Sequence, residues 1–174
     1  MPIANPTLLG ATRGLLWLIL GLVAAAALLV LVVSGALIAA WPEVLVEIKN
    51  SKSFIDAAAI RPLLGLLMVL LLTILAGAAY MLRQLQGLVA SAATDPFIPA
   101  NAGRLRHIGW ALVVVQLVAI PLGWVARRIA DAGGDLHAMG GFSLGGVLAI
   151  LLAFVLAAVF DQGAAMRDEL EGTV

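Results

Sequence analysis

The sequence predicts an all-α membrane protein, a four-helix transmembrane bundle with both termini on the same side. Hydrophobic residues make up 63% of the 174 residues, and Asp, Glu, Lys and Arg together make up 11%, against roughly 25% in soluble domains. Each of four stretches without charged residues is long enough to cross a hydrocarbon core of about 30 Å as a helix. These stretches are residues 14–42, 62–82, 108–126 and 136–160.

The first predicted span covers residues 15–41 and lies between two tryptophans. Trp17 and Trp41 suit the two membrane interfaces, and Pro42 lacks the amide that a continuing helix would use. The apolar run exceeds the roughly 7 to 15 residues of a signal-peptide core, so we expect it to be retained. Residues 43–61 carry too many charges to cross. The spacing of Ser53 and Asp56 resembles a capping box, which predicts a short surface helix leading to Pro62.

The second predicted span covers residues 63–82, with Pro62 in its first turn. Leu85, Leu88 and Val89 continue the helical spacing among polar neighbours. This pattern predicts an amphipathic segment over residues 83–107 that lies along the membrane surface.

The third and fourth predicted spans cover residues 108–126 and 141–160, and a tail of residues 161–174 completes a single membrane domain. Small residues recur at every fourth position of the last span. Because close backbone approach drives helix association in lipid, this ridge predicts a packing face inside the bundle, or alternatively a homodimer interface. The ridge consists of Gly141, Gly145, Ala149, Ala153 and Ala157.

The charges do not orient the chain but do indicate an interaction surface. With both termini on one side, five of the ten basic residues fall on each side, so the positive-inside rule gives no orientation. On the side of the termini, we predict that Arg104 or Arg106 pairs with Asp168 or Glu169. Exposed pairs of this kind contribute about 0 to 1 kcal/mol each. Together with Arg83, these residues form the candidate interaction surface.

No catalytic residue, cofactor site or metal site is predicted. The sequence has no cysteine, which excludes thiol chemistry and disulfides. Ser143 lies in a G-x-S-x-G pattern, but neither a preceding strand nor a later histidine accompanies it. His107 and His137 are expected near opposite faces and cannot share a metal. A formal net charge of zero gives no sign of direct nucleic-acid binding.

Gln116 is the polar residue of most interest at membrane depth. Polar side chains there mark either interhelical hydrogen bonds or transport pathways. The first alternative is a packing role. The second is a substrate contact, which in so apolar a bundle requires an oligomeric small-solute permease.

Two motifs carry a family resemblance: Asp-Pro-Phe-Ile-Pro-Ala-Asn at residues 95–101 and Arg-Leu-Arg-His-Ile-Gly-Trp at residues 104–110, together with the ending from Phe160 to Val174. They resemble the YoaS-like group, bacterial four-span inner-membrane proteins catalogued only as a domain of unknown function. The family pattern has Thr and Glu where this chain has Ile98 and Ala100, two departures that weaken the helix N-terminus.

The resemblance implies that both termini and residues 83–107 are cytoplasmic. Family members are often encoded beside a small helix-turn-helix regulator, which implies a cytoplasmic protein partner. We therefore expect a non-enzymatic membrane protein, with the lipid bilayer as its surroundings and a tethered regulatory role. The alternatives are the permease, or a structural accessory subunit that packs into a larger membrane complex through the small-residue ridge.

Overall fold

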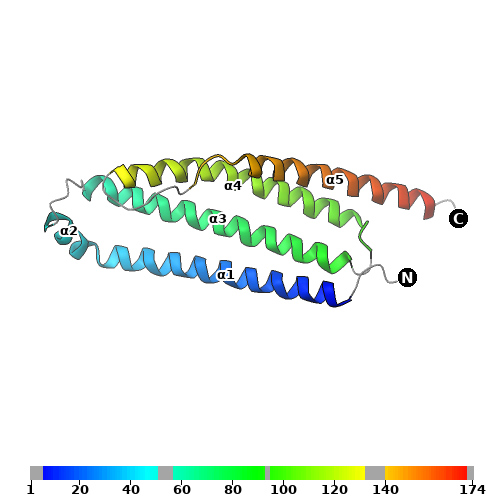
Figure 1. The fold of residues 1–174 in the computed structure, drawn as a ribbon, viewed down its shortest axis with the longest axis horizontal. Coiled ribbons are helices and arrows are strands. Elements are labelled where there is room, and N and C mark those ends of the chain that lie inside the picture. The colour runs from blue at the N-terminus through cyan, green and yellow to red at the C-terminus, as the bar shows by residue number, and fades with distance from the viewer. Residues whose placement is uncertain (1–5, 51–56, 93–94, 132–139, 172–174) are drawn as a thin grey trace. The chain divides into compact units, whose positions relative to one another are not determined.

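Five helices account for nearly all of the described chain (Figure 1). The computed structural model describes residues 6–50, 57–92, 95–131 and 140–171, and none of these residues lies in a strand. The prediction of an all-α fold is confirmed. The helices are α1 (Pro6–Ala39), α2 (Trp41–Asn50), α3 (Ala57–Ala92), α4 (Pro99–Asp131) and α5 (Leu144–Glu171).

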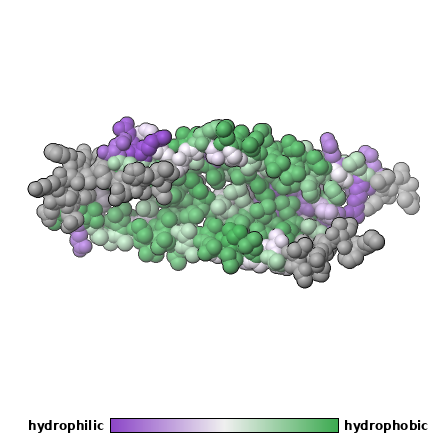
Figure 2. All heavy atoms as spheres, in the orientation of Figure 1, coloured by the Kyte–Doolittle hydropathy of each residue, from purple (hydrophilic) through white to green (hydrophobic). Residues whose placement is uncertain are grey.

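Four of the described helices are long and apolar enough to cross a membrane, as predicted. The segments with this property are Gly10–Ala39, Ile60–Ala92, Pro99–Asp131 and Leu144–Glu169. Figure 2 shows hydrophobic residues over the middle of the helices on the visible face and hydrophilic residues toward the helix ends. The chain is therefore a multi-pass membrane protein.

α1 and α2 are separated at Ala40, two residues before a proline and close to the predicted end of the first span. Pro42 has no backbone N–H, so it cannot bond back to the preceding turn. The amides of Glu43 and Val44 instead both donate to the carbonyl oxygen of Ala40, at 3.0 Å each. As a result α1 ends at Ala39, and α2 begins at Trp41.

The sequence predicted Pro62 in the first turn of its helix, and this prediction is wrong. α3 begins at Ala57, so Pro62 lies inside it. The three alanines of residues 57–59 are strong helix formers, and the proline removes only one backbone hydrogen bond near the helix start. The predicted surface helix that leads to Pro62 would begin at residues 51–56, which lie outside the described chain. α2 precedes them and was not predicted as a separate helix.

α5 begins at Leu144, three residues later than predicted. Gly140 and Gly141 have φ angles of 74° and 132°, values that glycine adopts readily and other residues avoid. The Gly141 amide donates to the carbonyl oxygen of Ala119 in α4 at 2.9 Å. Gly141 therefore joins a turn against α4 rather than the helical small-residue ridge, which is a correction to that prediction.

The chain forms two compact units, and α1, α3 and α4 each contribute to both. The first unit comprises Met1–Val23, Gly77–Val114 and Leu144–Val174, and the second comprises Ala24–Ala76 and Val115–Ser143. In the second unit, a core of large side chains joins α3 to α4. It consists of Leu67, Leu122, Val125 and Ile129. In the first unit many buried residues are small, and they include Ala102, Ala153, Ala157 and Ala164.

Candidate functional site

A network of polar contacts lies in the first unit, where α3 ends and α4 begins. At its centre, Nη1 of Arg104 donates to the Gly87 carbonyl oxygen at 3.0 Å and to Oδ1 of Asn101 at 2.7 Å. Because the C-terminal end of a helix carries partial negative charge, a guanidinium beside the last turns of α3 is favourably placed. Arg104 therefore joins α4 to the backbone of α3.

Gly87 permits this contact because it has no side chain. A Cβ atom at position 87 would lie 2.7 Å from Nε of Arg104, closer than real Cβ contacts. Any other residue would displace the guanidinium. The glycine thus lets the arginine reach the backbone of α3.

Asn101 is the buried hub of the same network, with 1% of its surface exposed. Its Oδ1 accepts hydrogen bonds from Arg104 and from Oγ of Ser91, the latter at 2.8 Å. Its Nδ2 donates to the Pro96 carbonyl oxygen at 2.8 Å. A single amide group therefore ties α3, the following turn and α4 together, as a buried polar group requires.

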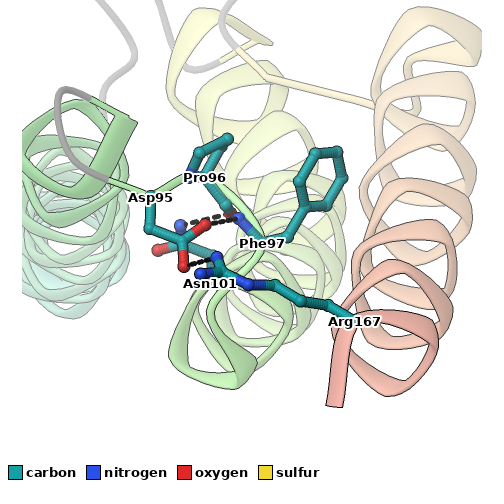
Figure 3. A network of polar contacts seen from close by, with 5 residues as sticks. All are labelled: Asp95, Pro96, Phe97, Asn101 and Arg167. Carbon is teal, nitrogen blue, oxygen red and sulfur yellow. Dashed lines mark hydrogen bonds and ion pairs between the residues drawn. The ribbon is translucent and has the colours of Figure 1, made fainter. Parts of the chain in front are cut away.

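Asp95 extends the network to α5, as Figure 3 shows. One carboxylate oxygen accepts a hydrogen bond from the Phe97 amide at 3.0 Å, the arrangement in which Asp stabilises a turn. The other oxygen forms an ion pair with Nη1 of Arg167. The turn between α3 and α4 is thereby linked to the end of α5.

The Phe97 ring packs over a glycine of α5. A Cβ atom at Gly163 would lie 2.8 Å from Cδ1 of Phe97, and the Phe97 and Phe160 ring centroids are 5.5 Å apart. A second contact between a ring and a glycine joins α4 to α5. A Cβ atom at Gly109 of α4 would lie 3.0 Å from Cζ of Phe154 of α5. Aromatic rings seated on glycines therefore bring α5 close to α4 and the turn.

The structure gives the predicted interaction surface different pairings. Arg106 lies 3.6 Å from Asp161, and both side chains are exposed. Arg104 is half-buried and belongs to the internal network, so neither arginine pairs with Asp168 or Glu169 as predicted. Asp168, Glu169 and Arg83 are exposed. Pairing between the 83–107 segment and the tail does occur, but it joins Arg106 to Asp161 and Asp95 to Arg167.

In the second unit, the amide of Gln116 connects α4 to the segment before α5. Nε2 of Gln116 donates to the carbonyl oxygen of Ser143 at 3.0 Å, the residue that directly precedes α5. This bond matches the packing role rather than the substrate contact.

The remaining predicted residues take these positions. On the ridge, Gly145 is exposed, Ala149 is half-buried, and Ala153 and Ala157 are buried. The His107 ring makes an edge contact with Tyr80, with centroids 6.3 Å apart, while His137 lies outside the described residues. Within the described chain, no group of three or more His, Cys, Asp or Glu residues could hold a metal ion.

Comparison with known proteins places the chain in a family. Residues 46–174 match the family described as "Protein of unknown function (DUF2975)". The chain belongs to the DUF2975 family. The prediction of a family of unknown function is confirmed. No curated protein and no solved structure matches the chain.

The DUF2975 region contains the whole polar network, but sequence analysis did not identify most of its members as site residues. Gly87 and Ser91 are one turn apart on α3, and Asn101 and Arg104 are one turn apart on α4. This helical spacing on both sides of a predicted turn was the signal that could have indicated a shared polar site. The residues missed were Gly87, Ser91, Asp95, Asn101 and Arg167.

Proposed function

We propose that this DUF2975 protein is a non-enzymatic protein of the bacterial inner membrane that binds a cytoplasmic protein through the charged end of its first unit. One observation carries the proposal. The ion pairs Asp95–Arg167 and Arg106–Asp161 join the tail of α5 to the α3–α4 region. The charged groups of these segments therefore form one ordered surface, as a recognition site requires.

The proposed partner is a small helix-turn-helix transcription regulator. The support is the resemblance to bacterial proteins encoded beside such regulators, which also supports a cytoplasmic location for both termini. Exposed side chains of both signs, among them Arg83, Arg106, Asp161 and Asp168, suit a partner with a mixed charge pattern, because charge complementarity governs specificity and association rate.

The permease and accessory-subunit alternatives have less support. The Gln116 amide is engaged by a backbone carbonyl, so it is not free to contact a solute. Ala153 and Ala157 of the ridge are buried within this chain, so they are not open to a second protein. A homo-oligomer that uses other faces is compatible with the proposal.

The test measures binding of the regulator encoded beside the gene to the purified protein in lipid nanodiscs. Replacing Arg83 and Arg106 together by glutamate should weaken binding at least about tenfold, since close charge pairs at interfaces couple by about 1.5 kcal/mol or more. The matched control replaces Arg127 and Arg128, at the other end of α4, by glutamate. Equal weakening by both double variants, or no binding of the regulator by the wild type, would contradict the proposal.

A further inference from the structure

A groove of about 370 Å³ lies in the second unit between α1 and α3. Its volume falls within the roughly 300 to 1,000 Å³ typical of ligand pockets. Its walls include Leu31 and Ser34 of α1, Trp41 at the start of α2, and Arg61, Gly65 and Leu72 of α3. Arg61 is the only charged residue among those that line it.

The charged end of the groove is held in place by an aromatic ring. Cζ of Arg61 lies 5.3 Å from the centroid of the Trp41 ring, a cation–π contact, and Trp41 is only 7% exposed. Arg61 itself is exposed, and among the residues whose side chains are described no carboxylate forms an ion pair with it. Its guanidinium group is therefore positioned to receive an anion.

The rest of the groove is apolar and has the length of one membrane leaflet. Leu31 and Trp41 are ten positions apart and Arg61 and Leu72 eleven, so the groove extends along the helices for roughly 15 Å. That is half of a hydrocarbon core of about 30 Å. Oγ of Ser34 donates to the Val30 carbonyl oxygen at 2.6 Å, so this hydroxyl proton is already used.

We propose that this groove binds an anionic phospholipid, with one acyl chain between α1 and α3 and the phosphate at Arg61. A basic residue near the membrane surface attracts an anionic headgroup, and the tryptophan beside Arg61 is expected at the membrane interface. A helix of a second copy is a poorer occupant, since a helix with its side chains is about 10 Å wide, and a segment as long as the groove would need more space than about 370 Å³. An acyl chain fits a groove of this volume that is apolar along its length and has one basic residue at its end.

Four variants test the two parts of the site. Gly65→Leu fills the groove, because a Cβ atom at position 65 meets nothing within 4 Å and the new side chain projects into free space. Gly35→Leu is its control, since position 35 is equally open and does not line the groove. Arg61→Gln removes the cation. Arg128→Gln is its control, because Arg128 lies at the same 5.3 Å from the Trp124 ring and neither residue lines the groove.

Binding of phosphatidylglycerol and of phosphatidylcholine to the full chain is measured by native mass spectrometry of the detergent-solubilised protein. The wild type should bind phosphatidylglycerol more tightly. Arg61→Gln should weaken that binding about fivefold, the effect of one basic residue near an anionic headgroup, and leave phosphatidylcholine unchanged. Gly65→Leu should weaken both lipids, and the two controls neither.

Three results would overturn the proposal. Equal binding of the two lipids by the wild type would exclude an anion-selective site. Equal losses in Arg61→Gln and Arg128→Gln would indicate attraction by surface charge in general. Unchanged binding in Gly65→Leu would place any bound lipid outside the groove.

Discussion

Arg104 of α4 contacts the backbone of α3 at Gly87, with Nη1 3.0 Å from the glycine carbonyl oxygen. The same nitrogen lies 2.7 Å from Oδ1 of the buried Asn101. A charged side chain thus stabilises the junction of two helices from within, while the neighbouring Arg106 is exposed. Two arginines of one turn therefore have different roles, one structural and one at the surface.

Replacement of Arg104 by methionine should destabilise the first unit. The substitution removes the hydrogen bonds to Gly87 and Asn101. One hydrogen bond to a charged group contributes about 1.5 to 3 kcal/mol, so we expect the free energy of unfolding to fall by at least about 2 kcal/mol. Arg104→Lys should recover only part of the loss, because lysine lacks the planar fork of donors. Unfolding by sodium dodecyl sulfate in mixed micelles, followed by circular dichroism, measures both variants.

Arg106→Met is the matched control for Arg104. Its ion pair with Asp161 spans 3.6 Å between exposed side chains, and such pairs contribute about 0 to 1 kcal/mol. A loss as large as that of Arg104→Met would show that burial does not distinguish the two arginines.

The membrane spans could be predicted because charge-free runs are local features of the sequence. The helix ends were harder: α3 starts at Ala57, before Pro62, because the alanines of residues 57–59 favour a helix. The polar network depends on the α3–α4 turn, which brings position 87 against position 104. A pattern of neighbouring residues in the sequence does not show that positions 87 and 104 are in contact.

The charge pairing could also be predicted only in part: the segments that meet were predicted, but the residues that pair were not. The opposite charges indicated that the tail would meet the 83–107 segment, but Arg106 pairs with Asp161 rather than with Asp168 or Glu169. Asp161 and Asp168 are seven positions apart, about two helical turns or 10 Å. The choice between them depends on how far α5 slides along α4, and aromatic rings on Gly109 and Gly163 set that register.

Gly163→Ala should therefore destabilise the protein. The added Cβ atom would lie 2.8 Å from Cδ1 of Phe97, so the ring must move, and overpacking of this kind costs about 1 to 3 kcal/mol. Gly35→Ala is the control, because a Cβ atom there meets nothing within 4 Å and alanine favours a helix over glycine by about 0.5 to 1 kcal/mol. Thermal unfolding in detergent should move in opposite directions for the two variants, and a shift of the same sign would be evidence against the register argument.

The Asp95–Arg167 pair should contribute little to stability and should respond to salt. Its side chains are 28% and 47% exposed, so a double-mutant cycle with Asp95→Asn and Arg167→Gln should give a coupling energy of about 0.2 to 1 kcal/mol. The coupling should shrink between low and high ionic strength, because exposed charges are screened. A large coupling that salt leaves unchanged would mean that the pair is a structural element rather than part of a surface.

Gln116→Leu should destabilise the second unit modestly. The variant loses the hydrogen bond from Nε2 to the Ser143 carbonyl oxygen, and interhelical hydrogen bonds in membranes contribute about 0.6 kcal/mol on average and at most about 1.7. Thr73→Val is the control at similar depth, because the Thr73 hydroxyl donates to Val69 of its own helix at 2.8 Å and holds no second helix. Unfolding in mixed micelles should therefore distinguish the two variants. If both variants were equally stable, the Gln116 bond would not hold the turn before α5, and its amide would again be available as a solute contact.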